Sequence, residues 1–117
     1  MGDAVNLAAK LATFDEKWSP RTVSIFNGHD VMVVKVEGEF NWHSHPDTDD
    51  FFLVVQGEIN IELRNGVVTL KAGEMFVVPK GVEHRPVARK EAHLLLIEPM
   101  GTPNTGDPTT AAKRKVI

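Results

Sequence analysis

The feature of this 117-residue chain that most restricts its fold is a series of turn signals at short, regular intervals. Asparagine followed by glycine is a strong hairpin signal, because both residues tolerate the positive φ that a tight β-turn requires. This pair occurs at Asn27-Gly28 and Asn65-Gly66, and further turn signals stand at Gly57, Ala72-Gly73 and Pro79-Lys80-Gly81. Short strands separated by turns about every eight to twelve residues are typical of an all-β barrel or sandwich.

The segments between these turns carry strand patterns of two kinds. Ile59, Ile61 and Leu63 alternate with polar residues, as in a strand with one face in water. Residues 51–55 and 94–97 are instead apolar throughout, which predicts a covering layer or a partner subunit on the outer face. We therefore expect a homodimer. We expect eight or nine strands, at residues 22–26, 31–36, 40–45, 50–56, 59–63, 67–70, 75–78, 82–88 and 93–97.

The two ends of the chain differ from this middle part. Residues 5–14 have a weak helical pattern that ends at the breaker Ser19-Pro20. Beyond Pro99 the chain is rich in Gly, Pro, Thr, Asn and Asp, so we expect a largely disordered tail over residues 101–117. The predicted organisation is an N-terminal segment over 1–20, one barrel over 21–99 and a flexible tail over 100–117.

Composition excludes several classes of function. The net charge of −3 provides no overall basic field for nucleic acid, and we interpret Lys113-Arg114-Lys115 as a solvated end. The chain has no cysteine, which removes disulfides, thiolate ligands and cysteine nucleophiles and suits a reducing cytoplasm. Residues 1–14 lack the pattern of a secretory signal, and the longest apolar run, residues 51–55, is too short to cross a bilayer. We expect a soluble cytoplasmic protein without a nucleic-acid or membrane partner.

The residues most suited to chemistry are three histidines and one aspartate. His43 and His45 lie two apart, so in an extended segment both imidazoles point to the same face. Imidazole is the commonest ligand for Zn, Fe, Ni and Cu, although such a pair by itself is equally consistent with two surface histidines. Asp50 begins the next predicted strand, and His84 follows the turn that ends at Gly81.

Other candidates for the site are weaker. Glu39 shares the parity of His43 and is either a proton donor or a plain surface charge. His29 falls in a turn, where exposure is expected, and His93 is either a structural histidine or part of the cavity wall. Parity places Phe40 and Trp42 on the opposite face from the histidines. The predicted pocket walls are Phe52 and Val54, with either Met75 and Val77 or Phe76 and Val78.

Two ordered motifs in this chain resemble those of the cupins. The segment Gly38-x4-His43-x-His45-x4-Asp50-x6-Gly57 is similar to the first cupin motif, and Gly73-x5-Pro79-x-Gly81-x2-His84 is similar to the second. The chain is therefore identified as a small single-domain cupin, of the mannose-6-phosphate isomerase-like conserved barrel type. The resemblance departs from the family at Asp50, where cupins usually carry glutamate, and at Ala88, where the second motif often has asparagine. Asp47 and Asp49 could replace Asp50, but only Asp50 keeps the spacing to Gly57.

The resemblance implies a cupin barrel, of the double-stranded β-helix or jelly-roll kind, with one divalent metal ion, Fe, Zn, Ni or Mn. The implied ligands are His43, His45, Asp50 and His84, and the implied ligand or substrate is a small molecule. Cupins include dioxygenases, isomerases, epimerases, decarboxylases and lyases, and also binding domains without activity, and the fold does not select among them. The favoured hypothesis is a metal-dependent enzyme with Glu39 and Asp50 as candidate proton-transfer groups. The alternatives are a small-molecule binding or sensing module and a metal-free interaction barrel.

Overall fold

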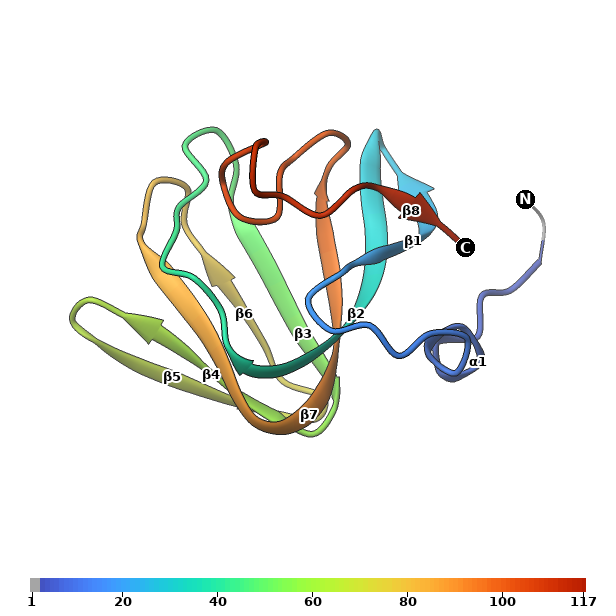
Figure 1. Cartoon of the computed structure of the whole chain (residues 1–117), viewed down its shortest axis with the longest axis horizontal. Helices are drawn as coiled ribbons and strands as arrows, with labels where there is room; N and C mark the ends of the chain where they lie inside the picture. The colour runs from blue at the N-terminus through green and yellow to red at the C-terminus, as the bar shows by residue number, and fades with distance from the viewer. Residues whose placement is uncertain (1–2) are drawn as a thin grey trace.

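The computed structural model describes residues 3–117, which form eight β-strands and one short helix (Figure 1). The chain is all-β, as the turn signals predict, apart from this helix near the N-terminus. In order, the elements are α1 (Leu7–Leu11), β1 (Arg21–Phe26), β2 (His29–Glu39), β3 (Asp50–Gln56), β4 (Glu58–Leu63), β5 (Gly66–Lys71), β6 (Met75–Val78), β7 (His84–Pro99) and β8 (Lys115–Val116). Among residues 3–117 no helix is both long and apolar enough to span a membrane.

The strand β7 connects the parts of the barrel. The sheet has the order β5-β4-β7-β2-β1-β8, and β3 pairs with both β7 and β6. The first residues of β7, from His84 to Val87, pair with β4, whereas the segment from His93 to Ile97 pairs with β3. The strand also pairs with β2 along most of its length. Because one strand is shared in this way, the sheet curves around a common interior (Figure 1).

The structure corrects three of the predicted strands. The strands predicted at 82–88 and 93–97 are parts of one strand, β7, which begins at His84, because the exposed charged residues 89–91 form a bulge opposite β2, between Val36 and Gly38, rather than a loop. Residues 40–45 form no strand, although the Phe40 backbone N–H donates to the Pro86 carbonyl and His43 forms a bridge with His84. Pro86 has no N–H to return a hydrogen bond, which interrupts the ladder between the two segments.

The core lies inside the barrel and follows the alternation of the strands. Ile59 and Ile61 are almost fully buried, as their alternation with polar residues predicts. In β7 the even-numbered residues Leu94 and Leu96 point into the same core. Burying an aliphatic side chain of this size stabilises a fold by about 1.5–3 kcal/mol, so these strands are held by their inner faces.

The outer faces of β3, β6 and β7 are also apolar. In the register of these strands, Val77 on β6 lies beside Phe51, and Phe51 lies beside Ile97 on β7. A second row joins Met75, Leu53 and Leu95 in the same way. Met75 and Val77 are 52% and 38% exposed, so the chain itself leaves this edge of the outer face open to solvent.

The C-terminal segment folds back over one end of the barrel instead of extending away from it (Figure 1). β8 pairs in parallel with β1, and the Arg114 guanidinium donates hydrogen bonds of 2.8 and 2.9 Å to the carboxylate of Asp30. The composition of residues 101–117 predicts flexibility. It carries no signal for the pairing with β1 or for the ion pair between Arg114 and Asp30, because the partners lie in other strands. The division of the chain at residues 20 and 99 stays a prediction.

Candidate metal centre

Backbone hydrogen bonds bring the two histidine segments together. The N–H of His43 donates to the His84 carbonyl at 3.1 Å, and the N–H of His84 donates to the His43 carbonyl at 2.9 Å. Two residues further along, the N–H of Gly81 donates to the carbonyl of His45 at 2.9 Å. Gly81 has a φ of +80°, which glycine adopts without the steric cost that a β-carbon imposes. The turn before His84 therefore positions both motifs at the same end of the barrel.

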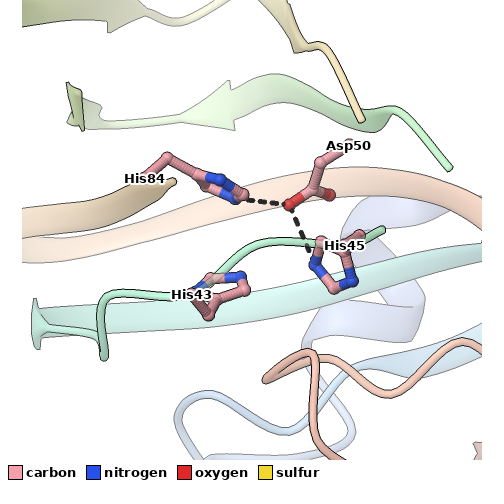
Figure 2. Close-up of side chains that lie close together, drawn as sticks. All are labelled: His43, His45, Asp50 and His84. Carbon is pink, nitrogen blue, oxygen red and sulfur yellow. Dashed lines mark hydrogen bonds and ion pairs between the residues drawn. The ribbon is translucent and has the colours of Figure 1, made fainter. Parts of the chain in front are cut away.

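Four side chains converge at this point (Figure 2). One potential ligand atom from each of His43, His45, Asp50 and His84 lies within 4.8 Å of the others. The Asp50 Oδ2 atom is 2.7 Å from Nε2 of His84 and 3.3 Å from Nε2 of His45. His45, Asp50 and His84 are buried, and His43 is partly exposed at the mouth. The sequence-predicted set is thus one cluster in the structure.

The backbone determines which nitrogen of each imidazole faces the cluster. Nδ1 of His84 lies 2.9 Å from the Val82 carbonyl oxygen, and Nδ1 of His43 lies 2.8 Å from the Asn41 carbonyl oxygen. A carbonyl oxygen only accepts hydrogen bonds, so in both rings Nδ1 carries the proton. In a neutral His84, Nε2 then presents a lone pair to the carboxylate oxygen of Asp50. Two acceptors at 2.7 Å require a positive charge between them, either a further proton or a metal cation.

The remaining observations also fit a cation. Nε2 of His45 is buried and has no hydrogen-bond partner among residues 3–117, although it lies 3.3 Å from Oδ2 of Asp50. Burial lowers the pKa of His43 from 6.5 to about 4, so its imidazole is neutral and able to donate electrons at neutral pH. Burial alone would raise the pKa of Asp50, but the adjacent imidazoles His45 and His84 hold it well below its usual range. Three imidazoles and an ionised carboxylate form a donor set that suits Zn, Fe, Ni or Mn.

Glu98 is a site residue that sequence reasoning missed. In the register of β3 and β7 it stands one residue beyond the Phe51–Ile97 pair, opposite Asp50, and it pairs directly with Asp30 of β2. Its side chain is 5% exposed. Burial raises the pKa of Glu98 from 4.5 to about 9, and the carboxylates of Asp50 and Asp30 add to this shift. A signal was present in the sequence, since Glu98 shares the inward parity of Leu94 and Leu96.

A pocket opens beside the cluster, and the structure decides which predicted residues form its walls. Phe52 lines it, whereas Val54 lies in the core below. Phe40 also lines it, because residues 40–42 leave the strand and the parity expected of them is lost. The ring of Phe40 stacks on Trp18 with their centroids 4.8 Å apart. Of the two alternative pairs on β6, Phe76 and Val78 face the interior.

The other candidates lie away from the cluster. Glu39 is on the outer surface, where it forms an ion pair with Arg85 at 3.2 Å. His93 points outward and contacts Glu91 at 2.7 Å. Asp49 accepts a hydrogen bond from the Lys80 backbone N–H at 2.9 Å, and the remaining three lie at exposed or partly exposed positions, namely Trp42, Asp47 and His29.

Comparisons with known proteins agree with this architecture. The Cupin domain family matches residues 30–98, which is more than half of the chain. The chain belongs to the cupin family. Protein YdbB of Bacillus subtilis is 33% identical over 109 residues, covering 84% of this chain and 96% of YdbB. Ala88, where the second cupin motif often has asparagine, is fully buried in the core of this cupin.

Solved structures show the same fold. A cupin-2 domain containing protein from Shewanella frigidimarina superposes with a TM-score of 0.80 at 47% identity, over 81% of this chain and 93% of that one. Hydroquinone 1,2-dioxygenase from Sphingomonas sp. TTNP3, solved with 4-hydroxybenzoate bound, has a TM-score of 0.72 at 24% identity, over 83% of this chain and 32% of its own. At that identity the second likeness concerns the fold alone.

The C-terminal segment contacts the histidine segment of the candidate metal centre at Gly106. This residue has a φ of +78°, and a β-carbon built on it would collide with the carbonyl oxygen of Ser44, between His43 and His45. Gly106→Ala should therefore displace the segment from the barrel, in addition to the cost of about 1–3 kcal/mol for an alanine in this backbone region. We expect faster amide hydrogen exchange over residues 100–117, measured by mass spectrometry.

Gly101→Ala is the matched control for that variant. Gly101 has a φ of +91°, and apart from its two chain neighbours no atom of the described residues lies within 4 Å of the position that a β-carbon would occupy there, so the control carries the backbone strain without the collision. Equal protection of residues 100–117 in the two variants would contradict a specific contact between Gly106 and Ser44.

Proposed function

We propose that this cupin holds one divalent metal ion with His43, His45, Asp50 and His84, and acts on a small molecule as a metal-dependent enzyme. The observations that carry this proposal are the convergence of the four side chains and the 2.7 Å contact between Nε2 of His84 and the Asp50 carboxylate, which requires a proton or a metal cation between the two atoms. A bound ion would supply Lewis-acid or redox chemistry to one group of the substrate, as in dioxygenases, isomerases or lyases.

The alternative is a binding or sensing module in which the metal anchors a ligand or is structural. Two observations count against a purely structural ion and agree with an ion that meets a small molecule. A pocket lies directly against His43 and Asp50, and a second carboxyl group, that of Glu98, faces the same pocket. A purely structural ion is enclosed by its protein ligands and needs neither feature. Glu39, on the outer surface with Arg85, is not supported as a proton-transfer group.

The proposal is tested by metal analysis followed by a test for an open coordination position. Untagged protein is incubated separately with Fe²⁺, Zn²⁺, Ni²⁺ and Mn²⁺, desalted and analysed by plasma mass spectrometry. We expect close to one ion per chain for at least one metal. Trace metal after every incubation would refute the metal site.

The enzyme and the structural-metal alternatives differ in whether the bound ion has a coordination position that an added ligand can occupy. In Co²⁺-loaded protein, azide should change the visible absorption spectrum if a coordination position is exchangeable, as catalysis requires. An unchanged spectrum at saturating azide would favour the alternative of a closed, structural ion.

We further propose that two copies of the chain associate through the outer face of β3, β6 and β7. The exposed apolar side chains Met75 and Val77 continue the rows formed by Phe51 and Leu53 on that face. Size-exclusion chromatography with light scattering should give about twice the chain mass of 12.9 kDa. Val77→Glu should shift the protein toward the monomer, and a wild-type monomer at all concentrations would exclude the dimer.

A further inference from the structure

The pocket beside the metal cluster has an uncommon balance of charge. Nine of its thirteen lining residues are apolar, and none is lysine or arginine. The polar lining consists of His43 and Asp50 from the cluster, Glu98 beside them, and Asn104 from the C-terminal segment. Every formal charge that the wall can carry, other than on a protonated histidine, is therefore negative.

Two arginines, Arg21 beside the lining residue Pro20 and Arg114 of the C-terminal segment, are bound to other residues. Arg114 donates both of its hydrogen bonds to Asp30, and Arg21 is bound by Ser19 and Glu16. An anionic group that enters an apolar pocket loses its hydration and needs a cation or several hydrogen-bond donors in return. The lining of this pocket offers no lysine or arginine, and the ionised carboxylate of Asp50 repels an anionic ligand.

The size and the walls of the pocket restrict the ligand further. Its cavity volume is about 40 Å³, room for about three water molecules at roughly 10–15 Å³ each, so the ligand body is a few atoms across. The Phe40 ring lies edge-on to His43 at 5.3 Å, and Phe52 lies edge-on to His84 at 5.9 Å, so apolar surface begins at the ligand histidines. If one group of a substrate binds the metal, the part of the substrate next to that group therefore contacts apolar side chains.

Asn104 is the single polar side chain that the C-terminal segment contributes to this wall. Its Oδ1 atom accepts a hydrogen bond from the Ala112 backbone N–H at 2.9 Å, and its Nδ2 atom donates to the Trp18 carbonyl at 3.4 Å. These two bonds leave one N–H of the amide for a ligand in the pocket that Asn104 lines. Asn104 lies outside residues 30–98, the part of the chain that matches the family, so this contact belongs to the chain's own C-terminal segment.

We infer that the site selects a small ligand that is uncharged apart from the group that binds the metal, because its wall lacks a cation, and that the uncharged side chain of Asn104 contributes to this selectivity. This inference rests on the proposed small-molecule function of the site. It excludes substrates that carry a carboxylate, sulfate or phosphate away from the metal, and it favours a compact apolar body with one hydrogen-bonding group.

The test uses acetamide and acetate, two probes of nearly the same shape that differ in charge. Binding to the full-length protein is measured by ligand-observed NMR at pH 7.5, with probe concentrations up to about 50 mM because ligands of four heavy atoms bind weakly. In metal-free protein we expect the amide to bind at least about tenfold more tightly than the carboxylate. With Zn²⁺ bound the carboxylate gains the ion as a partner, and the difference should narrow.

A pair of variants at Asn104 separates charge from shape. Asn104→Lys should shift the amide-to-carboxylate ratio at least about tenfold toward the carboxylate, whereas Asn104→Met, of similar length but uncharged, should not. Carboxylate binding equal to or tighter than that of the amide in the metal-free wild type would overturn the inference, as would binding of neither probe. Failure of the metal analysis would instead refute the metal site and leave this ratio unaffected, so the two failures are distinguishable.

Discussion

Replacing His84 with alanine should reduce bound metal from close to one ion per chain to a trace. His84 is 1% exposed, and its ring is fixed by the hydrogen bond from Nδ1 to the Val82 carbonyl. Removing even a residue that only supports a metal ligand lowers affinity by about 10–100-fold, so losing a ligand should exceed that range. The measurement is metal content by plasma mass spectrometry after incubation and desalting. The double variant His43→Ala, His84→Ala should hold no more metal than the single variant.

His93→Ala is the matched control for this experiment. His93 is also a histidine of β7, but it points outward and pairs with Glu91, so its removal should leave the metal content unchanged. The single variant His43→Ala guards against loss of fold, since His43 lies at the mouth and is only partly buried. Circular dichroism confirms that each variant is folded. Undiminished metal in the folded double variant would show that the ion binds elsewhere.

The second large effect is a change in the pH dependence of stability when Glu98 is replaced by glutamine. In the metal-free folded protein the pKa of Glu98 is raised to about 9, whereas in the unfolded chain it returns to its ordinary value near 4.5. Between these pH values the folded state holds a proton that the unfolded state has released. The contribution of Glu98 to the free energy of unfolding must therefore decrease as pH rises through this window, and this contribution levels off below 4.5 and above 9.

Glutamine has the shape of the protonated carboxyl group and does not titrate. Glu98→Gln should therefore remove the decrease and stabilise the protein around pH 8 by an amount on the order of a few kcal/mol, since each pKa unit corresponds to about 1.4 kcal/mol. Urea unfolding of metal-free protein at a series of pH values measures both curves. Glu83→Gln, at an exposed position, should follow the wild type. Parallel curves for Glu98→Gln and the wild type would show that Glu98 is ionised in the folded state.

Local sequence is sufficient to predict the parts of the site that depend on short segments. His43 and His45 share a face because they are two residues apart in an extended segment. Gly81 ends the turn before His84, and its backbone N–H donates to the His45 carbonyl. The spacing to Gly57 favours Asp50 over Asp49, and the structure buries Asp50 while Asp49 accepts a hydrogen bond from Lys80 at the surface. These features need only backbone periodicity and turn chemistry.

Parity fails where the chain leaves regular structure. It predicts Glu39 and Phe40 on the faces opposite to those they occupy, because residues 40–42 form no strand and the two-residue repeat does not hold there. The same local irregularity places Phe40 in the pocket and Glu39 against Arg85 outside it.

By itself, then, the sequence determined the all-β class, the cupin motifs and the four residues of the candidate metal centre, since each of these is encoded within a hairpin or its turns. Only the tertiary structure decided that Glu98 stands opposite Asp50, that Arg114 binds Asp30, and that Asn104 donates to Trp18 in the pocket wall. These contacts join residues that are 48 or more positions apart in the chain. Such pairs are set by strand register and by the path of the C-terminal segment, and no local pattern specifies either.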